Sequence, residues 1–236
     1  MSDSVTQAAV AAPSQNSTKM ILTLGLVATI SGALIVGSWQ LTLEKIKANR
    51  REQLRQAVLQ VLPDAHTVVT FVQDGETLVP TSGDVAPGQR RWFAGYTDEG
   101  GLAGIAIEAS GMGFADLIRV IYGYDPVSET VIGYTVLESK ETPGLGDRIQ
   151  SDPDFLANFL GLDVTLDPSG NDLANPLQVV KKGQKKSPWQ IDAITGATIS
   201  SKAIGRMLLA STKGELPMLK RNLERLSQPP AAGGRP

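Results

Sequence analysis

The stretch Asp192-Ala193-Ile194-Thr195-Gly196-Ala197-Thr198 places a turn of small and hydroxyl-bearing residues directly before an amphipathic segment, 199–210. Apolar residues recur there at three- and four-residue spacing, which predicts a helix with one apolar face, and Ser200 or Ser201 is expected to cap it. Backbone N–H groups at a helix N-terminus favour an anion, and Gly196 lets a ligand approach the backbone closely. The turn therefore predicts a phosphate site beside the Thr198 hydroxyl, although most turns of this composition only cap a helix.

The exact residues of this segment favour the phosphate site over an ordinary capping turn. Asp-x-x-Thr-Gly-Ala-Thr followed by Ile-Ser-Ser, residues 192–201, resembles the flavinylation motif of the FMN-binding domain family. The resemblance implies that a dedicated flavin transferase joins FMN to Thr198 through a phosphoester bond, with FAD as donor. The chain then needs no base of its own to activate the hydroxyl. The residues implied around the phosphate are Asp192, Thr195, Gly196, Ala197, Ser200, Ser201 and Lys202.

A second segment resembles the Glu-Thr-Pro-Gly-Leu-Gly loop of the same family, here Glu141, Thr142, Pro143, Gly144, Leu145 and Gly146. Its glycines allow close approach to a flat ring, while Leu145 offers an apolar face and Thr142 a hydrogen bond. A weaker match, Gly111-Met112-Gly113-Phe114 followed by 116–120, is similar to the turn and strand that open the flavin domain. The resemblance spans about residues 90 to 210 and implies that the flavin lies between the loop and the acceptor turn.

Two positions depart from the family pattern. Ser139 stands where relatives often carry His, and Phe114 where Tyr is more usual. Serine cannot supply a titrating imidazole, so a proton relay through position 139 is not expected in this chain. Neither departure touches the acceptor threonine.

Within the family, the chain most resembles the G subunit of Rnf-type complexes, which implies an electron-carrier protein without catalytic residues of its own. Such a complex moves electrons between ferredoxin and NAD and couples this to ion transport across the inner membrane. Its other subunits and the flavin transferase are the implied partners. The alternatives are the C subunit of the sodium-pumping NADH:quinone reductase and a flavin-free, membrane-tethered assembly module. A hydrolase with Thr198 as nucleophile lacks an evident base.

Composition excludes several classes of function. The net charge of −2 in 236 residues argues against a nucleic-acid partner. The absence of Cys excludes disulfides and thiolate iron–sulfur ligation, so electrons must travel on an organic cofactor or another subunit. The lone His66 predicts an exposed loop residue and no metal site. Glu138 and Glu141 lie three apart, which places them on opposite faces of an extended strand and argues against a paired acid–base site.

Four lysines, Lys181, Lys182, Lys185 and Lys186, surround Gly183 just before the acceptor segment. The ordinary interpretation is a solvated loop, and docking to an acidic partner is the alternative.

The N-terminal part predicts a membrane anchor. Met20 to Leu43 comprise 24 residues without a charge, enough at about 1.5 Å per residue to cross a hydrocarbon core of about 30 Å. We therefore predict a disordered tail at 1–18, a transmembrane helix at 19–44, and a juxtamembrane helix at 45–63. An FMN-binding domain at 64–226 and a disordered tail at 227–236 follow.

Charge and resemblance disagree on orientation. Five Lys and Arg residues follow the apolar run between 45 and 55 and only Lys19 precedes it, which predicts a cytoplasmic C-terminal domain. The family resemblance implies a periplasmic flavin domain on a single-pass protein of the bacterial inner membrane, and we adopt that expectation.

The soluble part predicts an α+β fold with an antiparallel sheet and flanking helices. Runs rich in Val, Ile and Tyr indicate strands at 67–72, 91–96, 101–109, 116–124 and 131–138, with a hairpin at 124–130. Asp152 and Pro153 predict the start of a short helix that ends at Gly161. Shorter strands are expected at 164–166, 177–181 and 189–191.

Overall fold

The computed structural model describes residues 17–81, 85–86 and 88–229. Its contacts divide the chain into two units, Met1–Arg51 and Glu52–Pro236. The helix α1, Ser17–Val61, passes from one unit into the other.

In the first unit α1 is long and apolar enough to cross a membrane, and its apolar side chains are exposed, as a lipid-facing helix requires. The predicted transmembrane and juxtamembrane helices are one continuous helix. Of the predicted tail at 1–18, Ser17 and Thr18 are helical and the rest lies outside the described residues. The predicted C-terminal tail lies outside them from 230 onward.

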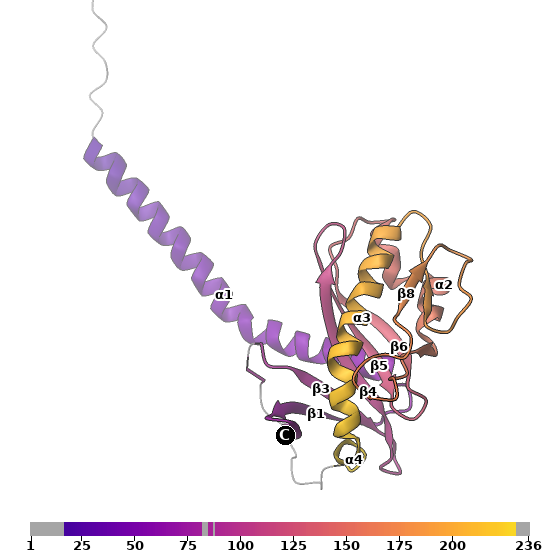
Figure 1. Ribbon diagram of the computed structural model, residues 1–236. Coiled ribbons are helices and arrows are strands. Elements are labelled where there is room, and N and C mark those ends of the chain that lie inside the picture. The colour runs from indigo at the N-terminus through magenta and orange to yellow at the C-terminus, as the bar shows by residue number, and fades with distance from the viewer. Residues whose placement is uncertain (1–16, 82–84, 87, 230–236) are drawn as a thin grey trace, which may run out of the picture. The chain divides into compact units, whose positions relative to one another are not determined.

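The second unit is built on a seven-stranded antiparallel sheet in the order β2-β1-β3-β4-β5-β6-β7 (Figure 1). The strands are β1 Thr67–Asp74, β2 Thr77–Thr81, β3 Arg91–Tyr96, β4 Leu102–Met112, β5 Leu117–Asp125, β6 Thr130–Glu138 and β7 Leu162–Asp163. The predicted hairpin joins β5 to β6, with the Asp125 carboxylate accepting from the Val127 amide at 2.8 Å. The predicted α+β architecture is confirmed.

One face of the sheet packs against the long helix α3, Thr198–Arg221, which lies across the strands in Figure 1. Because side chains alternate along a strand, every second residue of the central strands points into this core, including Trp92, Ile107 and Tyr122. On α3 the apolar stripe of Ile204, Met207 and Leu208 is buried as its spacing predicted. The helix is longer than the predicted 199–210 and is followed by α4, Leu223–Leu226.

The opposite face receives the end of α1. Val58, Val61 and Leu62 are at most 1% exposed and pack with Phe93, Ala106 and Ile121 of the sheet. Four glycines on consecutive strands make the room for them, Gly95, Gly104, Gly123 and Gly133. A Cβ atom on Gly133 would lie 2.7 Å from the Val61 carbonyl oxygen, and one on Gly123 would overlap the same atom. We call these four residues the glycine cradle.

The segment between β6 and α3 carries short elements. These are the 3-10 helices η1 Gly146–Gln150 and η2 Ala157–Phe159, the helix α2 Pro153–Leu156, and the parallel pair β8 Gln178–Val180 and β9 Gln190–Asp192. Asp152 caps α2 by accepting from the Phe155 amide at 3.1 Å, so the predicted helix start is confirmed, although its second half is 3-10.

One predicted strand is absent, and one observed strand was not predicted. The strand expected at 164–166 is absent, because the Val164 amide donates to Glu129 and Leu166 forms only an isolated bridge with Leu173; the pairing strand is β7, two residues earlier. The strand β2 was not foreseen. Its five residues include Pro80, which is tolerated at the sheet edge because an edge strand has unpaired N–H positions.

Candidate functional site

The acceptor turn ends where α3 begins. The N-cap is Ala197 and no side chain caps the helix, so the prediction that Ser200 or Ser201 is the cap was wrong. The helix starts at Thr198, one residue before the predicted segment, and both serines therefore lie inside its first turn. Gly196 has φ +86°, a left-handed conformation that favours glycine and that bends the chain into the helix.

The first turn of α3 leaves hydrogen-bonding groups open. Within the described part of the chain, the backbone N–H groups of Thr198, Ile199 and Ser200 have no acceptor, and the exposed Thr198 hydroxyl has no partner. Such N–H groups and the positive end of the helix dipole favour an anion. The geometry therefore offers an anion site that adjoins an exposed hydroxyl, and among the described residues no base is hydrogen-bonded to that hydroxyl.

A buried carboxylate joins this turn to the other predicted loop. Glu141, 5% exposed, accepts hydrogen bonds from the Ser200 hydroxyl and from the amides of Phe114 at 2.8 Å and Ala115 at 2.9 Å. Burial alone would raise the pKa of Glu141. The Ser200 hydroxyl and the two amides outweigh burial and hold that pKa below its ordinary value, so the side chain is an anion at neutral pH.

A cavity of about 300 Å³ lies between these segments. Three of its lining side chains, Phe114, Leu145 and Ile199, are apolar and exposed, and we call them the apolar rim. An apolar opening beside a helix N-terminus fits a molecule with a flat aromatic part and a phosphate. The lining residues are Phe114, Glu141, Thr142, Leu145, Gly146, Gly196, Ala197, Thr198, Ile199 and Ser200.

Most of the residues predicted from the two motifs line this cavity, and six do not: Pro143, Gly144, Asp192, Thr195, Ser201 and Lys202. Several of these have structural partners instead. The Asp192 carboxylate accepts from the amides of Gln184 and Lys185, at 3.2 and 3.0 Å. The Thr195 carbonyl accepts from Arg148 at 3.4 Å.

The serines have partners of their own. Ser201 accepts from the Ile194 amide at 3.0 Å and donates to the Ala197 carbonyl at 2.9 Å, so its hydroxyl holds the turn together. The Ser200 hydroxyl, predicted as a phosphate donor, donates to Glu141; only its backbone N–H remains for a ligand.

Phe114 and Ile199 are the lining residues that the sequence prediction missed. Phe114 was noted only as a departure from the family pattern, and Ile199 only as the start of the helix. For Ile199 the sequence did contain a sign of this role, because the residue lies off the apolar stripe of the helix, where a large apolar side chain is exposed; its exposed fraction is 54%.

Other predicted features lie away from the cavity. His66 is exposed, as predicted, and lies 3.7 Å from the Asp98 carboxylate. Glu138 ends β6 and faces Arg119 at 3.7 Å, so it does not pair with Glu141. Lys182, one of the four lysines around Gly183, forms an ion pair with Asp154 at 2.9 Å. Across the described ranges no group of three or more acidic or histidine side chains could hold a metal ion.

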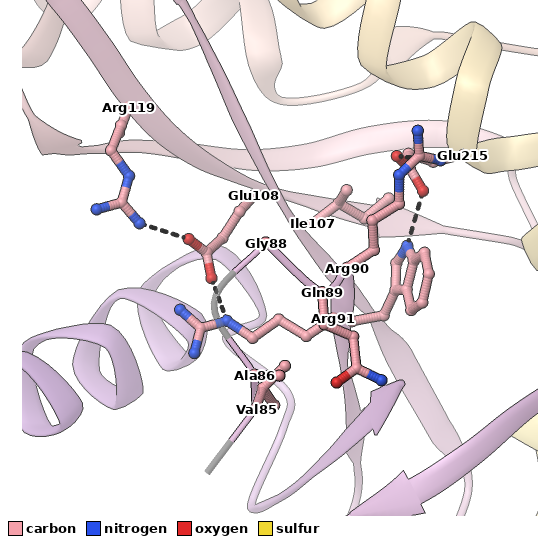
Figure 2. Close-up of a pocket in the computed structure, with 11 residues that line it drawn as sticks. Val85, Ala86, Gly88, Gln89, Arg90, Arg91, Ile107, Glu108, Arg119 and Glu215 are labelled. Carbon is pink, nitrogen blue, oxygen red and sulfur yellow. Dashed lines mark hydrogen bonds and ion pairs between the residues drawn. The ribbon is translucent and has the colours of Figure 1, made fainter. Parts of the chain in front are cut away.

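A second cavity, of about 330 Å³, lies at the start of β3 (Figure 2). Glu108 bridges Arg91 at 2.7 Å and Arg119 at 2.9 Å, and Glu215 accepts from the Trp92 indole at 3.2 Å. The charged side chains that line this cavity thus form ion pairs with one another. Neither predicted motif contributes to this cavity, and its ion-paired lining indicates a structural network.

Comparison with known proteins agrees with the site geometry. The model of the FMN-binding domain family matches residues 113–211, from the turn that contacts Glu141 to the middle of α3. The chain thus contains an FMN-binding domain.

Relatives that match 77 to 81% of the chain show to which proteins with such a domain it is similar. The G subunit of the ion-translocating oxidoreductase complex of Vibrio vulnificus is 34% identical over 188 residues, which cover 78% of this chain and 82% of that protein. The G subunit of Haemophilus influenzae (strain PittEE) is 30% identical over 182 residues, covering 77% and 81%. That of Methanosarcina acetivorans is 29% identical over 196 residues, covering 81% and 90%. The chain belongs to the family formed by the G subunits of ion-translocating oxidoreductase complexes.

Solved structures share the fold. Shewanella oneidensis NqrC has a TM-score of 0.55 at 20% identity, covering 76% of this chain and 98% of that one. The C subunit of the Na⁺-translocating NADH-quinone reductase from Parabacteroides distasonis has a TM-score of 0.59 at 22% identity, covering 75% and 96%.

Proposed function

We propose that this protein is the membrane-anchored flavoprotein subunit of an Rnf-type ion-translocating oxidoreductase complex, and that its FMN is esterified to Thr198. The relatives support the complex, since they are named as its G subunit. The observation that carries the site is the Thr198 hydroxyl at the first residue of α3, beside three open backbone N–H groups and an apolar cavity.

The residues present fit a bound flavin mononucleotide. The N–H groups of Thr198, Ile199 and Ser200 are suited to its phosphate, and the rim of Phe114, Leu145 and Ile199 to its ring. The flavin supplies the redox chemistry when bound, and the chain supplies position and surroundings. In the complex it would relay electrons on the path between ferredoxin and NAD.

Attachment requires a flavin transferase as partner. In the proposed transfer, the Thr198 oxygen forms a bond to the FMN phosphorus of FAD, the pyrophosphate bond breaks, AMP leaves, and the hydroxyl proton is released. Thr198 has no hydrogen-bonded base in the described structure, and the nearby Glu141 carboxylate is held by Ser200. An external enzyme therefore has to activate the hydroxyl, which also disfavours a hydrolase with Thr198 as nucleophile. The family resemblance implies a periplasmic transferase, and we therefore propose that the flavin domain lies in the periplasm.

The test is the intact mass of the full-length chain co-produced with a flavin transferase, followed by peptide mapping. We expect an increment of one FMN less one water on the Thr198 peptide, and none in Thr198→Ala. Thr195→Ala, three residues earlier in the same turn, is the matched control and should keep the increment. Covalent flavin in Thr198→Ala would refute the site. A colourless, unmodified wild-type chain would favour the flavin-free assembly module.

The C subunit of the sodium-pumping reductase remains the alternative within the same class. It shares the fold at 20 to 22% identity, whereas G subunits of the ion-translocating complex reach 34%.

A further inference from the structure

Three separate chain segments line the flavin cavity, and the side chain of Glu141, which belongs to one of them, hydrogen-bonds to the other two. Glu141 belongs to the loop after β6. Its Oε1 atom accepts from the two amides of the β4–β5 turn, Phe114 and Ala115, and its Oε2 atom accepts from Ser200 in the first turn of α3. Each carboxylate oxygen thus ties the loop to a different wall.

The space around this carboxylate is closed by two glycines. A Cβ atom on Gly146 would lie 2.5 Å from Glu141 Oε2 and 2.9 Å from the Ser200 hydroxyl. A Cβ atom on Gly113 would overlap Glu141 Oε1 and the Ile118 side chain. Glycine at both positions therefore leaves just enough space for the Glu141 carboxylate and its hydrogen bonds.

The negative charge of Glu141 is not neutralised by a cation. All three of its hydrogen-bond donors are uncharged groups, and none of the Lys, Arg or His residues that the structure describes lies within 4 Å of it. A buried anion without a counter-ion is costly unless hydrogen bonds compensate, as they do here. Its field therefore acts on whatever occupies the cavity that it lines.

We propose that Glu141 is a positioning residue for the flavin: it holds the Thr198 turn against the ring-binding loop, and its charge makes the bound flavin harder to reduce. This inference rests on the proposed function. A fixed negative charge beside a group that gains electrons opposes their uptake, so it lowers the reduction potential. The same carboxylate keeps the helix N-terminus in line with the cavity.

The experiment uses the full-length protein, flavinylated by co-production with a flavin transferase and purified in detergent. The midpoint potential is measured by spectroelectrochemical titration, and covalent occupancy by intact mass. Glu141→Gln keeps the size of the side chain and removes its charge. We expect a higher midpoint, equivalent to about a tenfold or larger increase in the equilibrium constant for reduction, and a severalfold lower rate of flavin attachment.

Two further variants separate charge from position. Ser200→Ala keeps the charge and breaks the link to α3, so attachment should slow while the midpoint changes much less than in Glu141→Gln. Glu138→Gln removes a half-exposed carboxylate three residues away and should change neither quantity. A structural role alone would not predict a potential that follows the charge.

An unchanged midpoint in flavinylated Glu141→Gln overturns the proposal. If Glu141→Gln cannot be obtained as folded protein, Glu141→Asp tests the positioning role. This variant keeps the charge, and its side chain is one methylene shorter. We expect slower attachment with a midpoint near wild type, and attachment at the wild-type rate would overturn the positioning role. A wild-type chain without covalent flavin would refute the proposed function itself, so the two failures are distinguishable.

Discussion

At the residue scale, the pKa values of two partly shielded carboxyl groups, Glu215 and Glu141, are shifted in opposite directions. Burial raises the pKa of Glu215 above its ordinary value, although Arg90 at 3.3 Å and the Trp92 indole lower it in part. Hydrogen bonds overcome burial at Glu141 and lower its pKa. The difference lies in the donors, since Glu141 accepts from two backbone amides that a folded chain cannot withdraw.

This contrast predicts the pH dependence of the variant Glu215→Gln. A carboxyl group whose folded-state pKa is raised stabilises the fold fully below its unfolded pKa, and that contribution is lost as the pH rises through the folded value. We therefore expect the variant to gain stability relative to wild type as the pH rises from about 4 to about 7. Thermal melting of the full-length chain in detergent at several pH values measures this.

The sign reverses at Glu141, whose contribution is present above its unfolded pKa and is lost as the pH falls through the folded one. Glu141→Gln should therefore lose stability relative to wild type as the pH rises toward the ordinary carboxyl pKa of 4.5, with little further change at higher pH. Parallel pH profiles for the two glutamine variants would contradict both assignments.

At the scale of elements, the contact between the end of α1 and the sheet leaves the least room for added atoms. The end of this helix reaches backbone-to-backbone contact with β5 and β6 because Gly123 and Gly133 carry no side chain. Gly123→Ala would place a methyl group against the Val61 carbonyl, and overpacking of this kind costs about 1–3 kcal/mol. We expect a lower melting temperature for this variant.

The matched control is Gly214→Ala in α3, where a Cβ atom would meet nothing within 4 Å. Alanine there should stabilise the helix by about 1 kcal/mol because glycine is a poor helix former. A wild-type melting temperature for Gly123→Ala would show that α1 does not sit in the glycine cradle in solution.

At the scale of the whole molecule, the side of the membrane on which the flavin domain lies is directly testable. The chain has no cysteine, so a single Val127→Cys provides a unique label site. Val127 lies in the β5–β6 turn and is 89% exposed. We expect a membrane-impermeant maleimide to label this variant in intact spheroplasts, because the proposed function places the flavin domain in the periplasm.

The wild-type chain is the negative control for that labelling. Reaction of Val127→Cys only after lysis would place the domain in the cytoplasm, as the Lys and Arg residues after the apolar run predict. That result would also require flavin attachment by a cytoplasmic enzyme.

Sequence patterns located most elements because their cause is local. The five longer strands were found from β-branched and aromatic runs, and α3 from the spacing of Ile204, Met207 and Leu208. The failures have a different origin. The cap of α3 was predicted wrongly because composition favours a hydroxyl residue at this position, whereas the helix begins after Ala197 and the hydroxyls of Ser200 and Ser201 bond elsewhere.

By itself, the sequence determined the apolar helix, the α+β class, and the two motifs on which the proposed flavin site rests, because each depends on neighbours along the chain. Only the tertiary structure decided that Glu141 and Ser200, 59 residues apart, share a hydrogen bond, and that Phe114 and Ile199 line the same cavity. It also decided that four glycines on separate strands face the end of α1. The reason is physical: such contacts depend on how strands register and how a helix crosses the sheet, which no local pattern of residues specifies.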